Sequence, residues 1–187
     1  MKQLELHDMN PSLSSELLEE LLPAYLQLLG ADYDAYKNHC MRVFNFCRAL
    51  VGNSPEVDDK IVVAAFFHEI GIWSDSTFDY IRPSQILARR YLEKSGRTVW
   101  IDEIEAMIGE HRKLTRYRVN PSWLVEAFRK AEWIDASGGM LRFRLPDDFV
   151  TDVLEAFPNA GFHKKLVELT VGRLKTHPFS PLPMIKF

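Results

Sequence analysis

One segment of this chain constrains its fold more than any other: an uninterrupted apolar run over residues 61–67 that ends in the polar pair His68-Glu69. An apolar stretch of that length within a helical pattern predicts a central helix that is buried on all sides. Its last turn would then carry an imidazole and a carboxylate into the interior, before Gly71 ends the helix. Buried polar groups are costly unless they are paired or bind a metal, so this pair predicts a metal site.

Helix signals recur along the whole chain. Asn10-Pro11 predicts the start of a first helix, and Asp32 predicts the start of a second that runs to about residue 51. Further helices are expected over residues 54–71, 83–96, 98–111, 121–137, 147–157 and 162–176. A Pro-rich tail follows, and it should be extended and packed on the surface. The sequence therefore predicts an all-α fold.

The composition is that of an ordinary globular protein. The chain has 187 residues, of which 47% are hydrophobic and 26% are charged, and this predicts a single domain over residues 1–187. We place its motif-bearing core at about residues 32–137 and its C-terminal helices and tail at 146–187. A formal net charge of −3 gives no electrostatic basis for binding a nucleic-acid polymer. No membrane span or signal peptide is visible, so a cytoplasmic protein is expected, with a homo-oligomer left open.

Four of the predicted helices each place an ionisable group on their apolar face, one turn away from apolar neighbours. These groups are His39, His68, His111 and Asp135, and Glu69 directly follows His68. Each residue alone could be a hydrogen-bonded core residue or a helix-end cap. Together, three inward imidazoles and two carboxylates make a ligand set for a divalent transition metal such as Mn, Fe, Co, Ni or Zn.

The order and spacing of these residues resemble those of the HD-domain superfamily of metal-dependent phosphohydrolases. The resemblance spans about residues 36–137 and rests on three short motifs: His39-Cys40-Met41-Arg42-Val43, Phe67-His68-Glu69-Ile70-Gly71 and Ala131-Glu132-Trp133-Ile134-Asp135. It implies a single-domain helical bundle of the HD type and a metal-dependent hydrolase of phosphoric esters. The metal ligands that it implies are His39, His68, Glu69 and Asp135.

The resemblance also implies a small phosphorylated substrate, such as a nucleotide, whose charge needs cations beside the metal. The substrate-binding candidates are Arg42, His111, Arg112 and Lys113. Arg42 follows His39 by one turn, and the two other cations directly follow His111. The catalytic candidates are His68 and Glu69, which act through the metal, and Glu110, which could serve as a general acid or base.

The chain departs from the family pattern at Glu69, where the family has Asp. The additional methylene moves the carboxylate by about 1.5 Å. A metal site of shifted geometry, a different chemistry and a site that has lost its metal are therefore all open. Two alternatives to the phosphohydrolase follow. One is an HD-fold hydratase or lyase that acts on a small nitrile-like substrate, which would not need the cations, and the other is a non-catalytic HD-fold binding module.

Overall fold

The structure is a computed structural model that describes residues 10–187. Within this range the chain is all-helical, as predicted. The α-helices are α1 (Glu16–Leu21), α2 (Leu26–Leu29), α3 (Tyr33–Val51), α4 (Pro55–Phe67), α5 (Gly71–Ser74), α6 (Ile81–Lys94), α7 (Ile101–Glu110), α8 (Val125–Ala136), α9 (Asp147–Ala156) and α10 (Phe162–Thr176). Short 3-10 helices cover Leu22–Tyr25, Gly30–Asp32 and Thr98–Trp100.

Local chemistry explains where α3 and α4 begin and end. Helix α3 starts after Asp32, as predicted, and ends at Gly52, whose φ of 85° an L-residue rarely adopts. The hydroxyl of Ser54 caps α4 by accepting a hydrogen bond from the backbone N–H of Val57, and Pro55 occupies the first turn. Helix α3 carries the first predicted motif, and the second motif begins at Phe67, the last residue of α4.

Several predicted helix boundaries are wrong, among them the start of the helix predicted at residue 121, which begins at Val125 as α8. Helix α1 begins at Glu16 rather than near Asn10, because the side chain of Asn45 binds both the backbone N–H and the carbonyl of Ser12 and keeps that segment out of a helix. Gly71 does not end a helix but begins α5. Helix α6 begins at Ile81, before Pro83, because proline is tolerated in a first turn, where its missing N–H has no helical partner.

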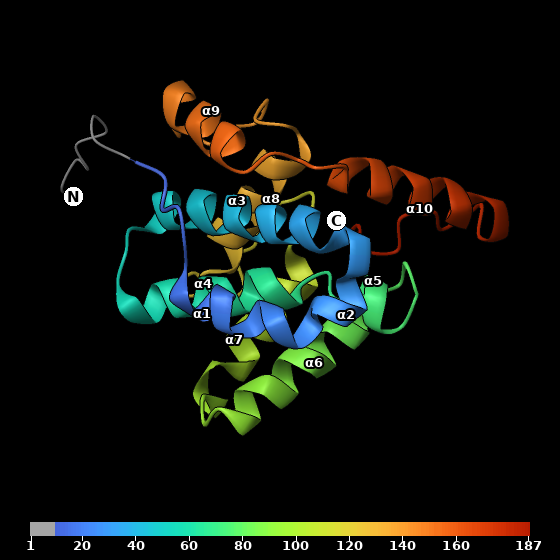
Figure 1. Cartoon of the computed structure of the whole chain (residues 1–187), viewed down its shortest axis with the longest axis horizontal. Helices are drawn as coiled ribbons and strands as arrows, with labels where there is room; N and C mark the ends of the chain where they lie inside the picture. The colour runs from blue at the N-terminus through green and yellow to red at the C-terminus, as the bar shows by residue number, and fades with distance from the viewer. Residues whose placement is uncertain (1–9) are drawn as a thin grey trace.

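Helix α4 lies at the centre of the bundle, as its apolar sequence predicts. Every residue of its 61–67 run is buried. Helix α3 packs against both α4 and α8, and α7 packs against α4, α6 and α8 (Figure 1). Helices α3, α4, α7 and α8 therefore meet in the interior, and each of them carries one of the predicted site residues or ends beside one.

The C-terminal residues return to the body of the protein instead of lying only on its surface. Helix α10 extends beyond the bundle, and the chain after it turns back beneath it (Figure 1). The carbonyl of Lys186 accepts a hydrogen bond of 2.8 Å from the backbone N–H of Leu114, and the Lys186 ammonium lies 2.9 Å from Glu110. Met184 is buried. The C-terminal segment, which was predicted to lie on the surface, is thus partly buried.

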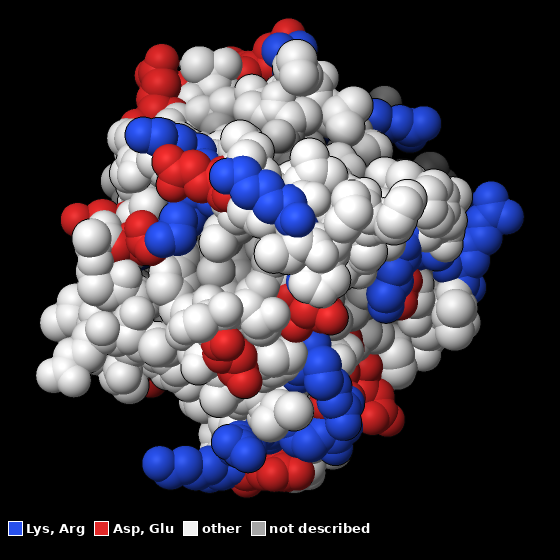
Figure 2. Space-filling model, turned by 90° about the vertical axis from the view of Figure 1, so that its right-hand side faces the viewer, with Lys and Arg blue, Asp and Glu red and all other residues white. Residues whose placement is uncertain are grey.

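The surface carries no strong field of one sign on the face that Figure 2 draws, where Lys and Arg are interspersed with Asp and Glu. Among the helices of residues 10–187, none combines the length and the apolar character that a bilayer span requires.

The approach of α5 to the start of α6 gives a first prediction. A Cβ at Gly71 would lie 2.5 Å from the carbonyl oxygen of Tyr80 and 3.0 Å from Ser84. Gly71→Ala should therefore lower the free energy of unfolding, measured with urea, by about 1–3 kcal/mol. Gly172→Ala is the matched control, because a Cβ at Gly172 in α10 meets no atom within 4 Å. It should leave stability unchanged or raise it by up to about 1 kcal/mol. Equal effects of the two substitutions would contradict this account of the packing.

Candidate metal centre

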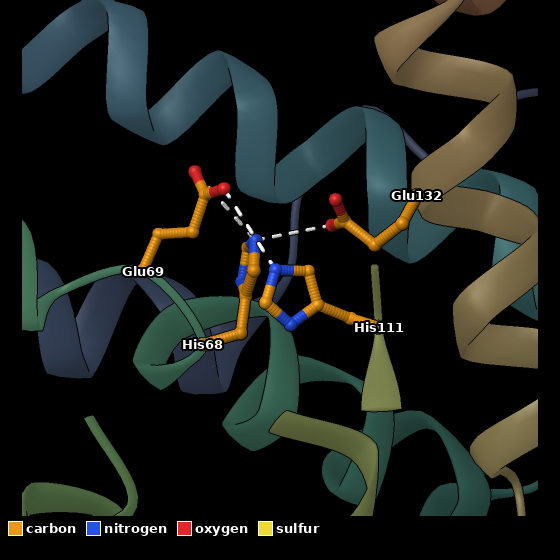
Figure 3. A group of neighbouring side chains, drawn as sticks. All are labelled: His68, Glu69, His111 and Glu132. Carbon is orange, nitrogen blue, oxygen red and sulfur yellow. Dashed lines mark ion pairs between the residues drawn. The ribbon is translucent and has the colours of Figure 1, made fainter. Parts of the chain in front are cut away.

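Four helices bring three imidazoles and two carboxylates together in the interior. His39 lies in the middle of α3, His68 and Glu69 directly follow α4, His111 directly follows α7, and Glu132 lies in α8. All five side chains are fully buried. Figure 3 shows the carboxylates of Glu69 and Glu132 facing the imidazole of His68 from opposite sides.

The three imidazoles are held in the same way. His68 Nδ1 lies 2.8 Å from the carbonyl oxygen of Ala65, and His111 Nδ1 lies 2.7 Å from that of Ile108. His39 Nδ1 lies 2.8 Å from Asp135 Oδ2. Each acceptor carries no hydrogen of its own, so each Nδ1 is the protonated nitrogen that donates the bond. This leaves Nε2 of every ring with a lone pair for another partner, an arrangement typical of metal-binding histidines.

The free nitrogens and the carboxylate oxygens converge. His68 Nε2 lies 3.0 Å from His39 Nε2 and 3.1 Å from Glu132 Oε1. The ligand atoms of His68, Glu69, His111 and Glu132 all lie within 4.8 Å of one another. Atoms that share one ion at about 2.0–2.2 Å lie about 3–4.4 Å apart. The observed spacings are close to that range, so this group could hold a metal ion.

The carboxylates supply independent support for an ion. Among the described residues, Glu69 Oε2 and both side-chain oxygens of Glu132 are buried and accept no hydrogen bond. His68 and Arg112 lie near Glu132, at 3.1 and 3.5 Å, without the alignment of a hydrogen bond. Unpartnered buried carboxylate oxygens are costly. The nitrogen and oxygen donors present fit a borderline divalent cation.

The pKa values of two histidines in the cluster shift in opposite directions. Burial disfavours a charge on His68, but the carboxylates of Glu132 and Glu69 outweigh burial and raise the pKa of His68. Burial and the nearby His68 lower the pKa of His111 to about 3, so His111 is neutral. For Glu132, burial is outweighed by His68, His39 and Arg112, and its pKa falls below its usual range. Arg112, His68 and His39 likewise outweigh burial at Glu69 and lower its pKa, so both carboxylates are ionised and available to a cation.

Asp135 lies behind His39 rather than among the converging atoms. Besides the bond from His39, its carboxylate accepts hydrogen bonds from Arg42 Nε and Nη2, and His163 Nε2 lies 3.3 Å from Oδ2. These partners outweigh burial and hold the pKa of Asp135 well below its usual range. The ring of Phe162 stacks on His39 at a centroid distance of 4.1 Å. This geometry gives Asp135 the position of a group that orients His39.

The predicted site residues thus fall into separate places. The structure brings His39, His68, Glu69 and His111 together, and Arg112 adjoins them, 3.0 Å from Glu69 Oε1. The other candidates lie apart from this cluster: Asp135, Arg42, Lys113 and Glu110. Arg42 is buried, and its guanidinium is bound to Asp135 and to the carbonyl of Phe157. This leaves it little freedom to bind a substrate. Glu110 pairs with Lys186 in the C-terminal segment.

Two residues of the site lay outside the predicted set. Glu132 is four residues after Phe128 and three before Asp135, so it lies on the same helical face as both. That spacing was visible in the sequence, but it is equally compatible with a buried face that contains Ala131 instead of Glu132. The hydroxyl of Tyr80 lies 3.0 Å from Glu69 Oε1 and 3.2 Å from His111 Nε2, and its single proton can be donated to only one of them.

No protein-family model, curated protein or solved structure is similar enough to this chain to count as a match.

The cluster gives a second prediction. Glu132→Gln keeps the side-chain shape but removes the negative charge, so affinity for Zn²⁺ or Mn²⁺ should fall. Loss of a residue that only hydrogen-bonds a metal ligand lowers affinity about 10–100-fold, and loss of a direct ligand should lower it further. Calorimetric titration of the metal-free protein measures this change. Glu155→Gln, an exposed substitution in α9, is the control and should bind like the wild type. Unchanged affinity in a folded Glu132→Gln protein would remove Glu132 from the ligand set.

Proposed function

We propose that this protein is a metal-dependent phosphohydrolase of the HD type that acts on a small phosphorylated molecule. One observation carries the proposal: three imidazoles, each fixed by a bond from Nδ1, direct their Nε2 atoms toward two buried carboxylates, three of whose four oxygens accept no hydrogen bond. A divalent metal bound there would polarise a substrate oxygen and lower the pKa of a water molecule. The residues of the chain supply the remaining functions.

Arg112 is the residue best placed to contact a phosphate. Its guanidinium lies 3.0 Å from Glu69 and 3.5 Å from Glu132, and it also lines a cavity beside the cluster. The two carboxylates outweigh burial and raise its pKa, so it stays charged. A guanidinium can donate two parallel hydrogen bonds to phosphate oxygens. Arg112 would thus orient the phosphate at the cluster and stabilise the charge that develops during hydrolysis.

The surroundings favour a small substrate over a polymer. The substrate-binding candidate Arg42 is bound to Asp135. Among the described Lys and Arg residues that were candidates for binding a phosphate, this leaves Arg112 as the one that contacts the cluster. Positive and negative side chains are interspersed on the face shown in Figure 2, which does not favour binding of a polyanion there.

A second function is supported by the low number of cations at the site. Hydration of a small nitrile-like molecule needs a metal and a source of protons but no cluster of positive charges. Tyr80 could supply the proton, because its hydroxyl touches Glu69 and His111. Burial and the charge of Glu69 raise the pKa of Tyr80, so its hydroxyl is protonated.

Substitution of Arg112 separates the two functions and gives a third prediction. Arg112→Gln removes a positive charge next to two carboxylates, so affinity for a divalent metal should stay equal or rise. Hydrolysis of phosphate esters should fall about 10–100-fold, the cost of losing hydrogen bonds to a charged group, whereas hydration should survive. Arg116→Gln, on the exposed loop that follows, is the control and should change neither.

The assay uses the protein loaded in turn with Mn²⁺, Fe²⁺, Co²⁺, Ni²⁺ and Zn²⁺, with a panel of small phosphate esters and nitriles as substrates. Metal-dependent release of phosphate that Arg112→Gln reduces would support the phosphohydrolase. Turnover of nitriles alone would support the second function. A protein that binds no metal would overturn both and leave a binding module.

A further inference from the structure

A cavity of about 200 Å³ lies beside the metal centre. One end of it is polar and is formed by Glu69, Tyr80 and Arg112. The remaining walls are largely apolar and include Trp133 of α8 and Leu166 of α10. The charged groups that line the cavity are thus confined to the end where the proposed reaction would take place.

Part of the apolar wall belongs to a small hydrophobic cluster that is distinct from the main core. The cluster contains Phe78, Tyr80 and Met184 together with Ile72 of α5. Met184 comes from the C-terminal segment, which is fastened to the loop after α7 by the backbone bond from Leu114 to Lys186. This segment therefore closes one side of the cavity, and the backbone bond to Leu114 holds it there.

The size of the cavity limits what it can enclose. An apolar cavity of about 150 Å³ is large enough to bind benzene. A volume of 200 Å³ therefore suits one aromatic ring or a short alkyl chain. A nucleoside carries a base, a sugar and several hydroxyl groups, and it would need both a larger volume and polar partners that the apolar walls do not supply.

We infer that this cavity is the subsite for the apolar body of the substrate. The substrate class is then a monoester of phosphate with one aromatic ring or a short alkyl chain, rather than a nucleotide. Its apolar body occupies the space between α8, α10 and the C-terminal segment, and its phosphate lies at Arg112 and Glu69. This inference rests on the proposed function for the phosphate end, while the apolar end stands on the cavity itself.

Two sets of probes test the two ends separately, and neither requires turnover. Toluene, titrated into the metal-free protein and followed by NMR, tests the cavity alone. Methyl-, butyl-, hexyl- and phenylphosphonate, titrated calorimetrically into the Zn²⁺-loaded protein, test the connection to the metal centre, because their P–C bond resists hydrolysis. Ribose 5-phosphate is the polar reference.

Substitution at Thr170 supplies the matched variants. Thr170 lines the cavity from α10, and Thr170→Trp should fill it. Leu174→Trp places the same side chain one turn further along α10, at an exposed position away from the cavity. Circular dichroism and melting temperature establish that both variants are folded. Ile185→Trp fills the cavity from the C-terminal segment and provides a second blocking variant if Thr170→Trp does not fold.

We expect toluene to bind the wild type and Leu174→Trp but not Thr170→Trp. Affinity for the alkylphosphonates should rise about threefold to fourfold per methylene as the chain enters the cavity, and phenylphosphonate should bind at least tenfold more tightly than ribose 5-phosphate. Thr170→Trp should abolish this dependence on chain length while methylphosphonate still binds.

Absence of toluene binding, or phosphonate affinities that do not depend on the organic group, would overturn the inference. Metal-dependent hydrolysis that is fastest on sugar phosphates or nucleotides would also overturn it and leave the proposed function intact. Dependence on chain length without hydrolysis of any phosphate ester would instead count against the phosphohydrolase and preserve the apolar subsite.

Discussion

The hydrogen bonds at Nδ1 of His39, His68 and His111 determine how the interior of this protein is organised. Each bond fixes the tautomer and the orientation of one ring, so that Nε2 points toward the common centre. For His68 and His111 the acceptor is a carbonyl three residues earlier, which lacks a backbone N–H partner because the helix ends there. The imidazoles of His68 and His111 therefore cap the ends of α4 and α7, and these helix ends in turn hold the imidazoles in the site.

The cluster is costly for the fold unless its carboxylates gain a partner. Glu69 and Glu132 are fully buried, and Arg112 is the one Lys or Arg among the described residues that the structure pairs with both. One guanidinium pairs with two carboxylates without satisfying all their oxygens. A divalent cation would satisfy them directly, so metal binding and stability of the folded state should be coupled. Asp135 holds His39 in place through a hydrogen bond to Nδ1, and Arg42 in turn holds the Asp135 carboxylate.

Local signals in the sequence predicted much of the fold. Asp32 marked the start of α3, and the apolar run before His68 identified the central helix. The site was harder to predict because its pairings join distant segments. Nothing local in the sequence shows that Arg42 is bound to a residue 93 positions later, or that Met184 forms a cavity wall beside Tyr80. Glu132 was missed for a different reason: the apolar face of α8 is broad enough to include two neighbouring positions, and helical spacing alone does not choose between them.

The central claim is that one metal ion binds between His68, Glu69, His111 and Glu132. Anomalous X-ray diffraction from crystals of the Zn²⁺-loaded protein, collected at the zinc absorption edge, tests it most directly. The account predicts a single strong anomalous peak in the interior, about 2.0–2.2 Å from Nε2 of His68 and from a carboxylate oxygen of Glu69 or Glu132. Zinc found only at the surface, with the interior carboxylates contacting Arg112 and His68 alone, would contradict it.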